Sequence, residues 1–128
     1  MSLETWKEKF YPEKPTKNMT KKAAIQHSIT KWIGLRPENL DKHKLELDVE
    51  GDLLEDGKYV FGVNSSSCAL CRKYYDDDDR GCQKCPLFKV LDNERCDYDN
   101  DSPFVIYRNE HNPEPMIAAL EKTLAENS

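Results

Sequence analysis

Residues 68–85 read CALCRKYYDDDDRGCQKC, with two Cys-x-x-Cys pairs on either side of a loop that holds four consecutive aspartates. A Cys-x-x-Cys turn brings two sulfurs to one ion, and two such turns complete the tetrahedral thiolate shell of a structural zinc site. We therefore expect one Zn2+ ion to be bound by Cys68, Cys71, Cys82 and Cys85. An iron–sulfur cluster or redox-active disulfides are the alternatives for the same four residues.

The fifth cysteine, Cys96, complicates this assignment because it follows Cys85 at the same spacing that separates the two pairs. It either replaces one of the paired cysteines as a ligand or is a small buried residue or free thiol. Four thiolates leave no coordination position for water, so we expect the zinc to be structural rather than catalytic. The chain also lacks the glycine-rich phosphate-binding motifs, the nucleophile elbow and the His-Glu-x-x-His pattern, and we predict that it is not an enzyme.

The loop between the cysteine pairs is acidic, which bears on the kind of partner. Zinc modules that bind nucleic acid usually direct Lys and Arg toward phosphates, whereas this loop would repel a phosphate backbone. The simpler interpretation is a solvated tip that keeps a metal loop soluble. The functional interpretation is a tyrosine-edged acidic patch for a basic protein surface, made by Tyr74, Tyr75, Asp76, Asp77, Asp78 and Asp79.

The net charge of −5 is unevenly distributed along the chain. Residues 1–44 carry a net charge of +5 and residues 45–128 a net charge of −10. The two parts either attract each other within one fold or present a basic and an acidic surface. A basic surface would make the chain a nucleic-acid-binding zinc module, which is the alternative function. Its contacts would be made by Lys17, Lys21, Lys22, Lys31 and Arg36.

Both segments that flank the cysteines have the composition of β-strands. Before them, residues 45–54 alternate in part, EDG at 55–57 indicates a turn, and KYVFGV at 58–63 is β-branched and aromatic. After them, PFVIYR at 103–108 follows a turn-like run of aspartates and is predicted to be a strand that pairs with 58–63. The zinc module would then be inserted between strands of a small antiparallel sheet.

Helices are expected before this sheet. Residues 3–10 have apolar side chains at helical spacing. Thr20 can cap a longer helix that Gly34 ends, and Pro37 suits the first turn of a short third helix over residues 37–43. The apolar stripe of the longer helix consists of Ile25, Ile29, Trp32 and Ile33. The residues placed away from the centre of that stripe are Lys22, His27 and Lys31.

A last helix is predicted over residues 112–126. Asn112 can cap it, Pro113 suits its first position, and Glu114 makes its first turn acidic. Its buried stripe consists of Met116, Ile117, Leu120 and Leu124. The chain has three histidines, which we expect to be structural or exposed rather than ligands or bases: His27, His43 and His111.

Together these elements predict an α+β fold with N-terminal helices, a small antiparallel sheet with an inserted four-cysteine zinc knuckle, and a C-terminal helix. Residues 1–128 would form one domain, with a basic helical part at 1–44, a β-hairpin and zinc-knuckle part at 45–110, and the last helix at 112–126. No apolar run approaches the roughly 18 residues of a membrane span, and the first residues lack the apolar stretch of a secretory signal. We expect a cytoplasmic protein with reduced cysteines and no membrane partner.

Four segments of the chain resemble segments of known proteins: HSITKWIGLRPENLDKH, CALC, CQKCPL with a later Cys and SPF, and PEPMIAALEK. In them the chain resembles a group of small cysteine-rich proteins of bacteriophage and prophage genomes with no known activity. The resemblance implies a setting inside an infected bacterial cell, and it implies that Cys96 belongs to the shared motif. With the acidic loop, it leads us to predict a non-enzymatic, zinc-stabilised interaction module, such as a phage accessory factor or an inhibitor of a host protein.

Overall fold

The computed structural model of the chain describes residues 3–12, 19–63, 90–91 and 102–126. This part contains five helices and one three-stranded antiparallel sheet, so the predicted α+β class is confirmed. The elements in chain order are α1 (Leu3–Phe10), α2 (Lys21–Ile33), α3 (Pro37–Lys42), β1 (Glu46–Leu47), β2 (Leu53–Glu55), β3 (Lys58–Phe61), α7 (Pro103–Glu110) and α8 (Glu114–Glu126). No helix among the described residues is long and apolar enough to cross a membrane.

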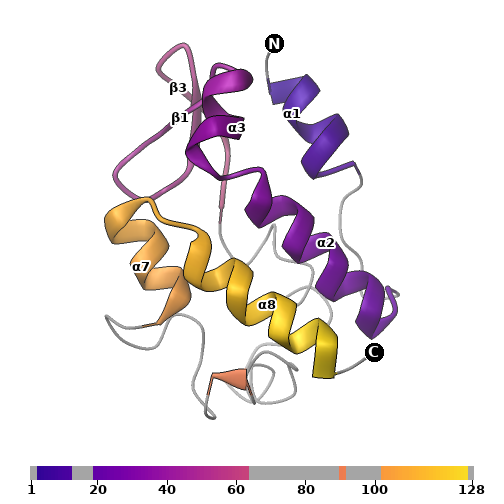
Figure 1. Cartoon of the computed structure of the whole chain (residues 1–128). Coiled ribbons are helices and arrows are strands. Elements are labelled where there is room, and N and C mark those ends of the chain that lie inside the picture. The colour runs from indigo at the N-terminus through magenta and orange to yellow at the C-terminus, as the bar shows by residue number, and fades with distance from the viewer. Residues whose placement is uncertain (1–2, 13–18, 64–89, 92–101, 127–128) are drawn as a thin grey trace, which may run out of the picture.

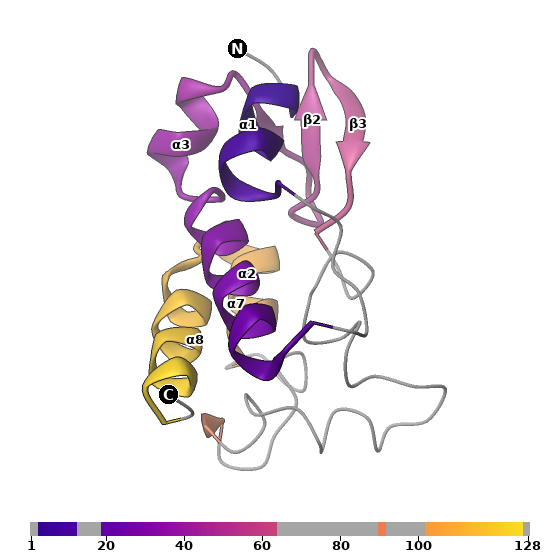
Figure 2. The same ribbon diagram turned by 90° about the vertical axis from the view of Figure 1, so that its right-hand side faces the viewer.

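The helices α2 and α8 lie side by side and run in opposite directions, and α7 packs against α8 (Figures 1 and 2). The predicted N-cap Thr20 is confirmed, whereas α8 begins at Glu114, so Pro113 rather than Asn112 is the residue that precedes its first helical position. The side chain of Thr20 accepts a hydrogen bond from the backbone N–H of Ala23 at 3.1 Å, and that of Asn112 accepts one from Glu114 at 3.1 Å. These contacts satisfy backbone N–H groups that have no partner within the helix. The predicted apolar face of α8 is buried at Met116, Ile117 and Leu120.

The buried face of α2 is rotated from the predicted stripe. Its fully buried residues are Ala24, Ile25, Ser28, Lys31 and Trp32. Ile29 and Ile33 are only half-buried, so the stripe centres on Ser28. The prediction that Lys31 lies off the buried face is wrong, because this residue is 1% exposed. Its long alkyl stem lets it pack beside Trp32, with Nζ 5.1 Å from the ring centroid.

The sheet has the order β1-β2-β3, and its β2–β3 hairpin is the one predicted from the EDG sequence. Asp56 and Gly57 both have positive φ, 54° and 79°, which is the requirement of a type I′ turn. A bulge follows, since Leu54 pairs with Tyr59 while Leu53 pairs with Phe61. The extra residue on β3 bends the strand next to the core.

The prediction that PFVIYR is a strand paired with β3 is wrong, because these residues form most of α7. Ser102 is extended, with φ −72° and ψ 142°, and Pro103 occupies the first helical position, where its fixed φ and missing N–H suit a helix start. Tyr107 is fully buried and meets Trp32 edge-on at a centroid distance of 4.7 Å. Packing against α2 and α8 thus outweighs the β propensity of Val105 and its neighbours.

The short helix α1 is held over the C-terminal end of α2 and against the hairpin (Figure 2). The indole N–H of Trp6 donates to the carbonyl of Gly34 at 2.8 Å, and its ring meets Phe61 edge-on at 5.3 Å. The ring of Phe10 lies directly over Gly34, where only a residue without Cβ leaves enough space. The helix predicted at residues 3–10 is therefore confirmed, and Trp6 and Phe10 fix it to the core.

Candidate functional site

The residues predicted to bind metal or a partner lie outside the described part of the chain. These residues are Cys68, Cys71, Cys82, Cys85, Cys96, Tyr74, Tyr75 and the four aspartates at 76–79. Within the described part, no group of three or more His, Cys, Asp or Glu side chains is arranged to hold a metal ion. The zinc site and the acidic partner patch therefore stay predictions.

The described residues do form a groove that the sequence did not reveal. It has a volume of about 620 Å3 and lies where α3, β1 and the end of α7 meet. Its inner lining is apolar, with Leu40 and Leu45 buried and Leu47 half-buried. Three exposed carboxylates stand around these leucines, on Glu38, Asp41 and Glu46. Pro37 and His111 complete the lining.

The turn that ends α3 brings the groove's leucines together. Lys44 has a left-handed backbone with φ 57°, its N–H bonds to the carbonyl of Asp41 at 3.1 Å, and the N–H of Leu45 bonds to the carbonyl of Leu40 at 2.9 Å. These two bonds define a Schellman motif, which commonly brings the apolar residues at the positions of Leu40 and Leu45 into contact. The chain then leaves this turn directly as β1.

Behind this turn, His43 is 7% exposed and fixes α3 to α1. Its Nδ1 lies 2.9 Å from the hydroxyl of Thr5, and its ring meets Phe10 edge-on at 6.0 Å. Burial lowers the pKa of His43, and the positive charges of Lys9, Lys42 and the N-terminus lower it further. The prediction that this histidine is structural agrees with its position in the described residues.

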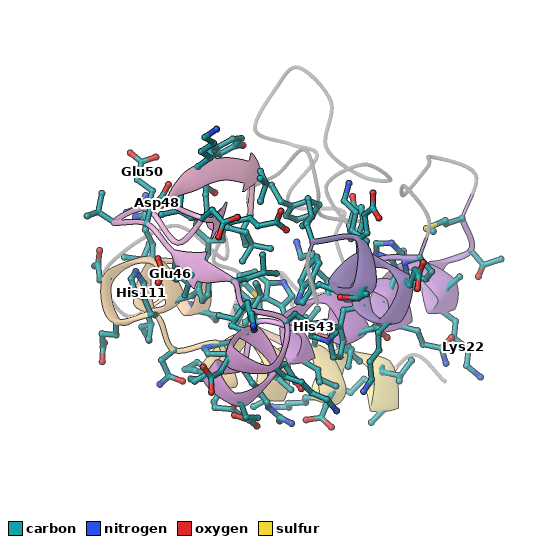
Figure 3. The ribbon with its side chains drawn as sticks, turned by 90° about the horizontal axis from the view of Figure 1, so that it is seen from above. Lys22, His43, Glu46, Asp48, Glu50 and His111 are labelled. Carbon is teal, nitrogen blue, oxygen red and sulfur yellow. The ribbon has the colours of Figure 1, made fainter. Side chains whose placement is uncertain are left out.

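On the opposite wall, His111 ends α7 in a left-handed conformation with φ 54°, and its N–H bonds to the carbonyl of Tyr107 at 2.6 Å. Figure 3 shows His111 beside Glu46, with Asp48 and Glu50 farther along the same side of the molecule. Asp48 is also structural, because its carboxylate accepts hydrogen bonds from the N–H groups of Glu50 and Asp52. Carboxylates thus continue from the groove onto the loop at 48–52.

The basic residues proposed for nucleic-acid binding do not form one free face among those that the structure describes. Lys21 and Lys22 are exposed at the start of α2, and Figure 3 shows Lys22 on the opposite side of the molecule from Glu46. Lys31 is buried. Arg36 is bound through two nitrogens to Glu114, at 2.9 and 3.1 Å, and this hydrogen bonding raises the pKa of Arg36. Lys17 lies outside the described residues.

No family model, curated protein or solved structure matches this chain. The groove is therefore interpreted from its own chemistry. Its buried leucines offer apolar contact area, and its exposed carboxylates favour a cationic ligand. The sequence carries only local signals of it, namely Pro37 at a helix start and the exposed Glu46 beside the half-buried Leu47 in the strand that follows the turn.

Proposed function

We propose that this chain is a non-catalytic protein-interaction module, stabilised by a structural zinc ion, that recognises a basic surface of a partner protein. The observation that carries the proposal is the groove between α3 and β1, where exposed carboxylates surround buried leucines. Apolar side chains supply contact area at a protein interface, while the charges around them select the partner and steer its approach. This groove fits Lys or Arg side chains around an apolar one.

The charge of the whole chain supports the same kind of partner. Residues 45–128 carry a net charge of −10, and the sequence adds four consecutive aspartates at 76–79. An excess of negative charge speeds encounter with a basic protein and slows encounter with nucleic acid. The sequence resembles proteins of bacteriophage and prophage genomes, and inside an infected cell the partner would be a protein of the host bacterium.

A structural zinc ion in the cysteine segment fits how that segment is connected to the core. Before it, the N–H of Val63 bonds to the carboxylate of Asp52 at 2.8 Å, and Val63 itself is buried. After it, Ser102 is buried at the start of α7. The unfolded chain has no preformed site, so metal binding between these two buried points would contribute to the free energy of folding.

Metal content tests the zinc part of the proposal. Protein purified without added metal, as wild type and as Cys96→Ser, is analysed by native mass spectrometry and elemental analysis. We expect one zinc per chain in the wild type. Zinc retained in Cys96→Ser assigns the four paired cysteines as the shell, and zinc lost assigns Cys96 as a ligand. No metal in the wild type, or iron with visible colour, would refute structural zinc.

Capture of partners from a bacterial lysate tests the interaction part. One variant neutralises the groove (Glu38→Gln, Asp41→Asn, Glu46→Gln), and a second changes the aspartates at 76–79 to Asn. A matched control neutralises exposed carboxylates elsewhere (Glu4→Gln, Glu8→Gln, Glu126→Gln). We expect specific capture by the wild type and the control and reduced capture by at least one acidic variant. Equal capture by all four folded proteins, or strong salt-sensitive binding to DNA instead, would contradict the proposal.

A further inference from the structure

We infer that the groove binds an extended cationic segment of a partner protein, which adds to the free edge of β1 as a further strand. The inference rests on the proposed function and names the chemistry of its ligand. Two independent features carry it: the side of β1 that pairs with no other described strand, and the opposite environments of its two residues, exposed Glu46 and half-buried Leu47. Strand addition to an exposed sheet edge is a general mode of peptide recognition, in which backbone bonds give affinity and side-chain sites give specificity.

The backbone of Leu47 faces away from the rest of the sheet. In the order β1-β2-β3, β1 pairs only with β2 among the described strands, and Leu47 lies opposite Leu53. The next residue, Asp48, donates its N–H to the carbonyl of Asp52 at 3.0 Å. Alternate residues of an antiparallel ladder direct their N–H and C=O groups to opposite sides, so Leu47 directs its own groups toward the free edge. Within the described part of the chain, Leu47 makes no backbone hydrogen bond outside the sheet.

The side chains beside this edge define the ligand's sequence pattern. Glu46 is exposed while Leu47 is half-buried and lines the groove with Leu45. A strand added at the edge would place alternate side chains next to these two faces, because successive residues point to opposite sides. Apolar side chains would thus pack beside the leucines, and Arg or Lys side chains would lie beside Glu46. The carboxylates of Glu38 and Asp41 add attraction from α3.

The probe is the peptide acetyl-Arg-Ile-Arg-Ile-Arg-amide, titrated into the full-length, metal-loaded protein labelled with 15N. We expect amide shift changes centred on Leu47, Glu46 and the α3–β1 turn. The same peptide with Glu in place of Arg should not bind. Neutralising Glu46 as Glu46→Gln should weaken binding about two- to fivefold, as for exposed ion pairs.

Backbone methylation of the peptide tests strand addition without changing the protein. One peptide is N-methylated at both Ile residues and another at the internal Arg residue and one terminal Arg. A strand that pairs with one edge uses only alternate N–H groups, so one methylated peptide should lose binding and the other should keep it. Equal binding by both would overturn strand addition, since a helix-like or side-chain-only mode would not discriminate between them.

The inference and the proposed function fail in different experiments. No peptide binding at millimolar concentration, or shift changes only outside the groove, would overturn the inference. The proposed function would still stand if lysate capture depended on the aspartates at 76–79. If neither acidic variant affects capture, the proposed function fails regardless of how the peptide behaves.

Discussion

The hydroxyl of Tyr107 donates a hydrogen bond to the carbonyl of Gly51, and the same ring occupies the space where a side chain at position 51 would stand. Burial raises the pKa of Tyr107, and the carboxylates of Asp52 and Asp48 raise it further, so the hydroxyl stays a donor. Because the loop at 48–52 also holds Val63 through Asp52, one loop fixes the chain on both sides of the cysteine segment.

Replacing Gly51 should therefore destabilise the fold. Gly51 has φ +84°, and a Cβ there would lie 2.6 Å from Cε2 of Tyr107. We expect Gly51→Ala to lower the free energy of unfolding by about 2–4 kcal/mol, from left-handed strain together with overpacking. Urea denaturation followed by tryptophan fluorescence measures the loss.

Gly57 provides the matched control for this substitution. It has a similar φ of +79°, but a Cβ there would meet nothing within 4 Å. Gly57→Ala should cost only the conformational strain, about 1–2 kcal/mol. If the two glycine variants were equally destabilised, contact with Tyr107 would contribute nothing and the assigned role of this pair would be wrong.

A second close approach joins α1 to α2. A Cβ on Gly34 would lie 2.5 Å from Cγ of Phe10, so Gly34→Ala should cost about 1–3 kcal/mol of stability through overpacking. A Phe10→Ala background removes the contacts with Cγ and Cδ2 of the ring but keeps the Cβ of residue 10, which would lie 2.6 Å from the added Cβ, so the same substitution should cost less there without becoming neutral. A double-mutant cycle by urea denaturation isolates this coupling. Additive losses would show that the two residues do not interact.

Stability should fall as the pH falls below about 6.5, the ordinary pKa of histidine. His43 has a lowered pKa in the folded state, so folding favours the neutral ring. The contribution is fully present above the unfolded pKa and is lost as the unfolded chain takes up a proton that the folded chain excludes. Protonation would place a buried cation near Lys9 and Lys42, with Nε2 lacking a hydrogen-bond partner among the described residues.

The measurement compares the free energy of unfolding of wild type and His43→Gln from pH 7 to pH 5. One excluded proton can account for at most about 1.4 kcal/mol per pH unit. We expect the variant to be less stable at pH 7 but to lose less stability on acidification than the wild type. His27 and His111 are present in both proteins, so any contribution they make cancels in the comparison. If the two plots of unfolding free energy against pH were parallel, His43 would not be the source of the pH dependence.

The sequence predicted well those elements that depend on interactions between residues close together in the chain. Thr20 caps α2 by a bond to an N–H three residues on, Asn112 accepts a bond from Glu114 just before α8, and the Asp56–Gly57 turn needs only residues that accept positive φ. The prediction for the segment at 103–108 failed because a short run of β-branched and aromatic residues is as compatible with a buried helix as with a strand. The packing of α7 against α8 and of Tyr107 against Trp32 decides for the helix, and sequence periodicity does not reveal those contacts.

The groove was not predictable for a related reason. Its leucines come from a helix, a turn and a two-residue strand, and its far wall is His111, which is distant in sequence. The turn depends on Lys44 in a left-handed conformation, for which a lysine gives no signal, since glycine usually occupies that position. The burial of Lys31 was not predictable from the sequence either, because it results from tertiary packing around the alkyl stem, which outweighs the preference of the charge for water.

The turn at Lys44 offers a direct test of how the groove is built. Replacing Lys44 by Gly should remove the strain of a left-handed non-glycine residue, at some cost in unfolded-chain entropy, and stabilise the protein by up to about 1 kcal/mol. Lys44→Val should destabilise it by more than roughly 1 kcal/mol, because a β-branched side chain tolerates positive φ poorly.

The same pair of variants separates the turn from the ligand site. Lys44 is exposed and does not line the groove, so Lys44→Gly should leave peptide affinity unchanged or slightly higher through the loss of one nearby cation. Lys44→Val should weaken both the fold and the binding, since displacing the turn separates Leu40 from Leu45. Thermal denaturation and the peptide titration give the two readouts. A more stable Lys44→Val than Lys44→Gly would contradict the left-handed turn on which the groove depends.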